Sequence, residues 1–237
     1  MEIKDLFALF SNHPVLGRCH DDLLAGKSMH LKGLAGSGRT FAVSMLAQLH
    51  SNRPHLIIMD DKEEAAYLQN DLEESGTKAL FYPESYRNPY EIERTDNANI
   101  QIRTEVLTAL SKNGNRVVVT YPAALFEKVV LKKTLKQHSF KISTDQELSI
   151  DFLNEVLIDY HFEKVDFVAE PGQFAIRGGI VDVFSFSHDE PYRIEFFGDE
   201  VDSIRTFDVE TQLSTEKVKK ITIIPNVENK FLQETRE

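Results

Sequence analysis

One glycine-rich stretch decides the fold: Gly33-Leu34-Ala35-Gly36-Ser37-Gly38-Arg39-Thr40. It satisfies every fixed position of the phosphate-loop pattern Gly-x4-Gly-Lys-[Ser/Thr] except the lysine, which is Arg39. Glycines let the backbone N–H groups of such a loop converge on phosphate oxygens, and the following helix presents its positive end. Arginine is longer, planar and forked, so it does not replace the compact charge of lysine at this crowded point. The pattern therefore predicts a nucleotide-binding ancestry in which catalysis has been lost.

The residues around this loop fit the strand, loop and helix order that a phosphate-binding fold requires. Residues 28–32 predict a short strand, and residues 40–49 place apolar side chains at helical spacing. The alternative is a glycine turn that only joins a strand to a helix. We expect a genuine but degenerate phosphate loop that is made of Gly33, Gly36, Gly38, Arg39 and Thr40.

Two adjacent carboxylates, Asp60 and Asp61, follow an apolar run and resemble the acidic pair that binds magnesium in nucleotide hydrolases. A helix N-cap is the competing interpretation, since Glu63 or Glu64 follows three residues later. We favour the cap, because the pair follows the first strand after the loop, which is too early for the usual magnesium ligand. Lacking both the lysine and a metal ligand, the chain is expected to have no catalytic residue, no metal site and no cofactor.

The composition is that of an ordinary globular protein of 237 residues, with 41% hydrophobic residues, 27% charged residues and a net charge of −11. Phosphate contacts need clustered Lys and Arg, so a chain this acidic is a poor candidate for binding DNA alone. No apolar run is long enough to cross a membrane, and the first residues do not form a secretory signal. The single cysteine, Cys19, is expected to be an inert core thiol, and these features together predict a cytoplasmic protein.

The spacing of apolar residues divides the chain into two halves. The first half alternates strands with helices, and its strands are continuous apolar runs, which predicts a parallel, helix-covered sheet. From about residue 141 the strands follow one another closely, with turn signals at Gly178-Gly179 and Gly198-Asp199, which predicts a small α+β domain with an antiparallel sheet. The expected strands are 55–59, 79–82, 116–120, 164–168, 173–186, 192–197, 201–207 and 218–225, and the expected helices are 40–49, 63–74, 100–110 and 148–160.

Two further segments permit a nucleic-acid interpretation. Pro83–Tyr90 is aromatic and punctuated by prolines, so it could stack bases, although packing over a domain edge is the more common role. Residues 128–141 contain five lysines, for which a solvated helix face is an equally good explanation. Steep salt dependence of DNA binding would separate these alternatives.

One arginine of the second half stands apart from its neighbours. Residues 160–208 contain eleven acidic and four basic side chains, so Arg193 and Arg205 are expected to be neutralised by adjacent acids. Arg177 instead follows Phe174 and precedes the double glycine, which predicts a tight and exposed edge. Because arginine and aromatic residues dominate protein interfaces, we expect a partner-binding face centred on Arg177.

Two stretches of the second half resemble a known family. Phe174–Phe184 and Tyr192–Asp208, with their Arg-Gly-Gly and Phe-Phe-Gly-Asp-Glu-Val-Asp-Ser-Ile sequences, are similar to the sheet of the second domain of UvrB. The resemblance runs through almost the whole chain and fits best the N-terminal UvrB-like module of the bacterial transcription-repair coupling factor, Mfd. This chain has Arg39 where UvrB has a working lysine, and Ala175 where UvrB tends to carry a second arginine. The stretch from Tyr86 to Arg103 also looks shorter than the UvrB segment that forms a DNA-inserting hairpin.

The resemblance implies an α/β fold in which a degenerate P-loop domain, RecA-like and UvrB-like, carries an inserted small α+β domain. Residues 1–125 would form the domain that is similar to UvrB domain 1a. Residues 126–208 would form the UvrA-binding domain, similar to UvrB domain 2. Residues 209–237 would return to the first domain, in the manner of UvrB domain 1b.

The resemblance also implies a function without catalysis, which is recruitment of UvrA to transcription sites stalled at lesions during nucleotide excision repair. Position by position, Arg177 matches a basic UvrA-contacting residue and Lys164 lies near another, and we add Phe174 and Phe184 as apolar contacts. The ATP-driven motor of the family, with its contacts to RNA polymerase and DNA, would lie in a missing C-terminal part. Distal domains of that part would be further partners and would mask the UvrA face, and no membrane partner is expected. The alternative is a fragment of UvrB or of another DNA-stimulated ATPase, which would bind nucleotide at residues 32–40.

Overall fold

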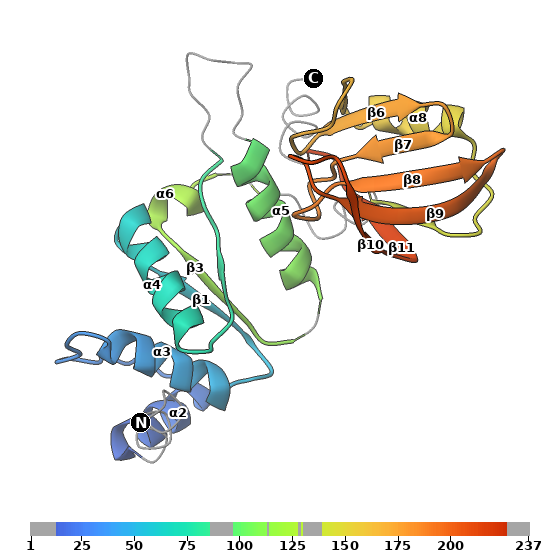
Figure 1. Cartoon of the computed structure of the whole chain (residues 1–237). Coiled ribbons are helices and arrows are strands. Elements are labelled where there is room, and N and C mark those ends of the chain that lie inside the picture. The colour runs from blue at the N-terminus through green and yellow to red at the C-terminus, as the bar shows by residue number, and fades with distance from the viewer. Residues whose placement is uncertain (1–12, 86–96, 113, 128, 130–138, 227–237) are drawn as a thin grey trace, which may run out of the picture. The chain divides into compact units, whose positions relative to one another are not determined.

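The computed structural model describes residues 13–85, 97–112, 114–127, 129 and 139–226, and these form two compact units. The first unit consists of the described parts of Met1–Pro83 and Lys112–Phe126. The second consists of the described parts of Glu84–Ser111 and Glu127–Glu237. Both units combine helices and strands (Figure 1), which confirms the predicted α/β class. None of the described helices is long and apolar enough to cross a membrane.

The first unit contains a parallel sheet with the strand order β1-β3-β2, formed by β1 (Pro54–Ile58), β3 (Arg116–Thr120) and β2 (Ala79–Phe81). Its helices are α2 (Pro14–Leu24), α3 (Gly38–Leu49), α4 (Lys62–Glu74) and the short α6 (Pro122–Leu125). Helix α4 packs on β2 and β3, and α3 packs on α4 and α2 (Figure 1). Cys19 on α2 is buried, as expected of a core thiol.

The strand predicted at residues 28–32 does not form. The segment has no regular structure and lies outside the sheet, so this prediction is wrong. Its polar residues, His30 and Lys32, are exposed, and Leu31 is only partly buried against Leu16 and Met45. Met29 is also only partly buried, and a segment that fully buries no apolar side chain gains too little from burial to be held in strand geometry.

The second unit is built on a six-stranded sheet in which every neighbouring pair is antiparallel except β5 and β6. The strand order is β10-β9-β8-β7-β6-β5. The strands are β5 (Glu163–Lys164), β6 (Gln173–Arg177), β7 (Ile180–Val183), β8 (Tyr192–Phe197), β9 (Glu200–Phe207) and β10 (Ser214–Lys217).

One face of this sheet is covered by the main core of the unit. Helix α8 (Ile150–Asp159) begins at Ser149, whose hydroxyl accepts a hydrogen bond from the N–H of Phe152 at 3.2 Å. The helix buries Leu153 and Leu157 against the sheet. A two-stranded sheet of β4 (Phe140–Ser143) and β11 (Lys220–Ile223) adds its isoleucines to the same core, and helix α5 (Asn97–Ser111) adds Ile100.

These contacts differ from the predicted domain boundaries. Residues 209–237 were expected to return to the first domain, but β10 and β11 belong to the second unit, because they pair with β9 and β4. Helix α5 also belongs to the second unit, although residues 1–125 were assigned to the first. Pro83–Tyr90 and residues 128–141 lie largely outside the described residues, so their nucleic-acid interpretations stay predictions.

The predicted strand 173–186 is divided into the hairpin of β6 and β7 by the double glycine. Gly178 has φ +60°, a conformation that glycine adopts readily. A Cβ atom added to Gly179 would lie 3.1 Å from the carbonyl oxygen of Phe196, so the backbones of β7 and β8 approach closely here. The turn places Arg177 at the end of β6.

The acidic pair before α4 is resolved in favour of the helix cap. Asp61 is the N-cap, and its Oδ1 accepts a hydrogen bond of 2.8 Å from the backbone N–H of Glu64. We expect Asp61→Ala to destabilise the first unit by about 1 kcal/mol, because that N–H loses its partner. Urea unfolding followed by circular dichroism would measure this. Asp60→Ala is the matched control and should have little effect, and equal losses in the two variants would contradict the assignment.

Candidate partner-binding site

A row of polar side chains crosses one face of the six-stranded sheet. Strand register places Asp182 between Ala175 and Arg193, and Arg193 between Asp182 and Arg205. Side chains alternate between the two faces along a strand. The residues adjacent to this row point into the core under α8: Phe174, Val181, Ile194 and Ile204. The row therefore lies on the opposite side, which we call the outer face.

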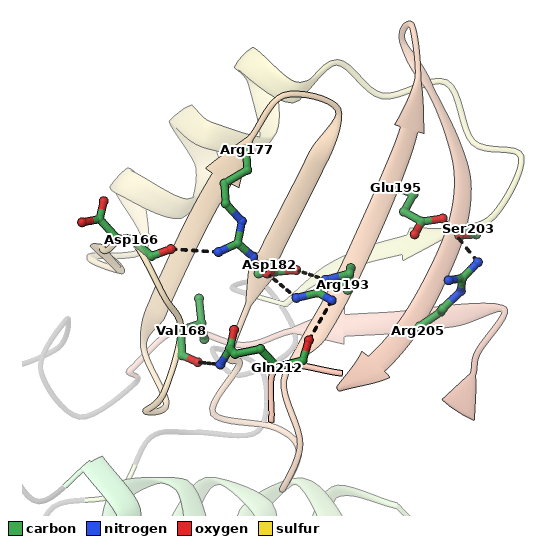
Figure 2. Close-up of polar contacts among 9 residues, drawn as sticks. All are labelled: Asp166, Val168, Arg177, Asp182, Arg193, Glu195, Ser203, Arg205 and Gln212. Atoms are coloured by element: carbon green, nitrogen blue, oxygen red, sulfur yellow. Dashed lines mark hydrogen bonds and ion pairs between the residues drawn. The ribbon is translucent and has the colours of Figure 1, made fainter. Parts of the chain in front are cut away.

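Asp182 is the centre of the row and is fully buried. Its carboxylate accepts hydrogen bonds from Nε of Arg193 at 2.8 Å and from Nη2 of Arg193 at 2.9 Å, and a third from Nη2 of Arg177 (Figure 2). A buried carboxylate is tolerated only when it is paired and hydrogen-bonded. Because two guanidinium groups share one carboxylate, the cluster carries a surplus of one positive charge.

Arg193 is the structural member of the pair. Its side chain is 15% exposed, its Nη1 donates to the backbone oxygen of Gln212 at 3.1 Å, and its guanidinium lies 4.7 Å from the ring centroid of Phe207. The hydrogen bond to Asp182 raises the pKa of Arg193, while burial acts in the opposite sense. Gln212 is itself fixed by a hydrogen bond from its Nε2 to the Val168 oxygen at 3.1 Å. The expectation that Arg193 is neutralised is therefore confirmed.

Arg205 is also paired, as expected. Its Nη2 lies 3.5 Å from Oε2 of Glu195, and the same carboxylate oxygen accepts a hydrogen bond from the hydroxyl of Ser203 (Figure 2). Both charged side chains are about one third exposed, so solvent screens the pair. Arg205 thus adds little free charge to the outer face.

Arg177 is the exposed member of the cluster, with 38% of its side chain accessible. Besides its bond to Asp182, its Nη1 donates to the backbone oxygen of Asp166 at 2.9 Å. Its guanidinium also lies 5.4 Å from the ring centroid of Phe167, which is 67% exposed. A guanidinium group has five N–H donors, so donors of Arg177 remain for a partner. The expected exposed edge is present, and it includes an aromatic residue, Phe167, that the sequence pattern did not indicate.

Phe174 and Phe184 do not present side chains to a partner. Phe174 is fully buried in the core under α8, and Phe184 is buried beneath the outer face with Val168, Ala175 and Phe207. Their assignment as direct contacts is therefore corrected, because buried rings lack the accessible surface that contact requires. Phe184 supports the face on which Arg177 lies.

Lys164 is not brought together with Arg177. It is exposed on the edge strand β5, and its register partner is Phe174. Register partners point to the same face of a sheet, so Lys164 lies toward the side of α8 rather than toward the outer face. Val165, the next residue, packs under the outer face with Ala175 and Phe184, in keeping with this alternation.

The glycine loop keeps part of the predicted phosphate-loop geometry. Gly33 and Gly36 have φ of +79° and +53°, and α3 begins at Gly38. However, the strand that should precede the loop is absent, so the loop is not fixed to the edge of the sheet as the motif requires.

The side chains of the loop are engaged by α4. Nη1 of Arg39 lies 3.1 Å from Oε2 of Glu64, in a half-exposed ion pair. The hydroxyl of Thr40 is buried and lies 3.5 Å from Oδ2 of Asp71. Within the described ranges, no group of three or more His, Cys, Asp or Glu side chains could hold a metal ion. The guanidinium of Arg39, which a phosphate group would need as its cation, is thus already paired with Glu64.

Residues 140–228 match the family described as the UvrB interaction domain. This chain contains a UvrB interaction domain. The domain covers β4 to β11, and hence Asp182 and both of its arginine partners.

The chain is homologous over most of its length to two kinds of repair protein. It is 31% identical over 216 residues to the transcription-repair-coupling factor of Bacillus subtilis, which covers 89% of this chain and 18% of that protein. It is 31% identical over 228 residues to the transcription-repair-coupling factor of Myxococcus xanthus, and the alignment covers 91% of this chain and 19% of that protein. It is 30% identical over 215 residues to the UvrABC system protein B of Streptococcus mutans, and the alignment covers 84% of this chain and 32% of that protein. The chain therefore spans under a fifth of these coupling factors and about a third of that UvrB protein.

Asp182, the central residue of the outer face, was not predicted from the sequence, where it counted only as one of the acidic residues. Its signal is a lone carboxylate in the apolar run Ile180-Val181-Asp182-Val183. An acid in a strand that is otherwise buried needs a cationic partner on a neighbouring strand. The strand register decides which of the nearby arginines is that partner, and the register cannot be derived from the sequence.

We expect Asp182→Ala to lower the free energy of unfolding of the UvrB interaction domain by about 3–5 kcal/mol, because the buried guanidinium of Arg193 loses its carboxylate. Glu195→Gln is a control in the same sheet and should cost less than about 1 kcal/mol, because its partner Arg205 is partly exposed. Thermal or urea unfolding measures both. A loss of less than about 1 kcal/mol for Asp182→Ala would contradict the central role of this residue.

We also expect no hydrolysis of ATP by this chain in the presence of magnesium. Arg39→Lys should not restore it, because α4 engages the loop side chains and the preceding strand is absent. Phosphate release measured against a heat-treated sample tests both statements. Turnover above that background in either protein would contradict them.

Proposed function

We propose that this chain is a non-catalytic module of a transcription-repair coupling factor that recruits UvrA to transcription complexes stalled at DNA lesions. The observation that carries the proposal is the Arg177 side chain, which is 38% exposed and is held on the outer face of a UvrB interaction domain. RNA polymerase, DNA and distal domains of the same protein would be engaged through parts that lie outside this sequence. A cytoplasmic location goes with this role.

The outer face has the properties of a protein-binding surface. Arginine and aromatic residues are enriched among the residues that contribute most to interface energy, and here Arg177 lies beside the exposed ring of Phe167. Arg177 is also held by two hydrogen bonds before any partner arrives. Side chains that are already ordered lose less entropy on binding, which favours affinity.

A nucleic-acid partner for this chain alone is less well supported. Phosphate binding requires several clustered cations, whereas the net charge is −11. On the outer face, Arg193 and Arg205 are paired with Asp182 and Glu195. One surplus positive charge suits a single carboxylate on a protein partner better than a phosphate backbone.

A fragment of UvrB is the second candidate, because UvrB proteins match this chain at similar identity. The two candidates differ in nucleotide binding at Gly33 to Thr40. The coupling-factor module predicts no thermal stabilisation by ATP and magnesium, since Arg39 is paired with Glu64 and replaces the phosphate-binding lysine. A clear thermal shift would favour the UvrB fragment.

We expect Arg177→Ala to weaken binding to purified UvrA by roughly 2 kcal/mol, about 30-fold, as for an anchor residue in an interface. A calorimetric titration measures the change. Lys164→Ala is the matched control, because it also removes a cation from the same sheet but lies toward the other face. Its expected effect is less than about 0.5 kcal/mol.

Two outcomes would contradict the proposal. If the unsubstituted chain does not bind UvrA, the recruitment role is wrong for this module. If Lys164→Ala weakens binding as strongly as Arg177→Ala, the partner contacts the edge or the α8 side of the sheet instead of the outer face.

A further inference from the structure

Asp182 accepts a hydrogen bond from a second guanidinium, beyond the one that balances its charge within the sheet. Arg193 alone bonds both carboxylate oxygens, with two parallel hydrogen bonds of 2.8 and 2.9 Å, and neutralises the charge. The third bond, from Nη2 of Arg177, adds a second guanidinium to a charge that is already balanced. This third bond is the only one that joins the buried pair to an exposed side chain within the described outer face.

Arg177 is held from two opposite sides. Asp182 lies on β7 and bonds Nη2, while the backbone oxygen of Asp166 bonds Nη1 at 2.9 Å from the other side (Figure 2). Phe167 adds contact with the guanidinium at 5.4 Å. Arg177 lies at the end of β6 beside the Gly178 turn, where a long side chain would otherwise sample many rotamers. The two hydrogen bonds therefore fix both the position and the plane of the guanidinium.

We propose that Asp182 is a positioning residue that acts through Arg177, holding its guanidinium in the orientation in which it donates to a carboxylate of the partner. This inference rests on the proposed recruitment of UvrA. The class of partner group follows from charge, because two guanidinium groups around one carboxylate leave one positive charge. Arg177 is the more accessible of the two arginines, with 38% of its side chain exposed against 15% for Arg193. Arg193 anchors Asp182, and Asp182 in turn anchors Arg177.

A double-mutant cycle tests the coupling. Asp182→Asn keeps the shape of the side chain but removes its charge, and we expect it to weaken UvrA binding about 10-fold, a coupling typical of residues in one hydrogen-bonded network. In an Arg177→Ala background the same substitution should have no further effect, because the residue through which it acts is gone. Additive losses in the double variant would overturn the proposal.

A stability control separates positioning from general destabilisation. Leu157→Ala, in the core on the opposite side of the sheet, should lower the thermal midpoint at least as much as Asp182→Asn. It should nevertheless bind UvrA within about 2-fold of the unsubstituted chain, since additivity holds for distant sites. Equal losses of affinity in these two variants would show that Asp182 acts only through stability.

A substitution at the exposed residue covers the case in which Asp182→Asn does not fold. Arg177→Lys keeps the charge, but one ammonium group cannot reproduce the forked geometry that bonds Asp182 and the Asp166 oxygen together. We expect it to lose nearly as much affinity as Arg177→Ala. Binding equal to that of the unsubstituted chain would overturn the proposal, because a fixed guanidinium plane would then be unnecessary.

A measurement on this chain in the absence of UvrA distinguishes the positioning role of Asp182 from the recruitment role. Nuclear magnetic resonance of the arginine side chains should show a slowly rotating, ordered Arg177 guanidinium in the unsubstituted chain and a freely rotating one in Asp182→Asn. If Arg177 is ordered in both proteins, the positioning role is wrong even when UvrA binds. If UvrA does not bind but the signals change as expected, the recruitment role fails while the clamp on Arg177 stands.

Discussion

The outer face of the second unit depends on burying one carboxylate, Asp182, between two guanidinium groups. An ionised carboxylate away from water is strongly unfavourable unless its charge and its lone pairs are both satisfied. Arg193 neutralises the charge and bonds both oxygens from the neighbouring strand, directly opposite in register, and Arg177 adds a third hydrogen bond. This pairing favours the observed alignment of β7 with β8, because a slip of one residue would turn Arg193 to the other face of the sheet, away from Asp182.

The same pair connects two loops to the sheet. The loop that follows β9 is ordered by Asp208, whose Oδ1 accepts hydrogen bonds from the backbone and hydroxyl of Thr211, and these bonds lower the pKa of Asp208. Gln212 in this loop accepts from Arg193 and donates to the oxygen of Val168. Arg177, bonded to Asp182, holds the adjoining segment through the Asp166 oxygen. The sheet thus positions two loop segments beside the strand residues of the outer face, and loops held by a rigid scaffold are common in binding sites.

Much of the fold could be predicted from the sequence, because apolar periodicity reports burial directly. The helices α3, α4, α5 and α8 and most strands were expected within a few residues of their observed bounds. The strand at residues 28–32 failed, because its two apolar residues, Met29 and Leu31, are only partly buried and the segment does not join the sheet. The site was predicted only at Arg177. Asp182 escaped because its partners depend on strand register, and Phe174 and Phe184 were misplaced because aromatic composition does not reveal which face of a strand is covered.

Hydrogen–deuterium exchange of this chain, with and without purified UvrA, is the most direct test of the central claim that Asp182 and its arginines form a partner-binding face. The account predicts that UvrA slows exchange in the segment that contains Asp166 and Phe167 and in the Arg177–Gly179 turn. Exchange around α8 and in the first unit should be unchanged. Protection confined to α8 or to the glycine loop, with no effect near Arg177, would contradict the account.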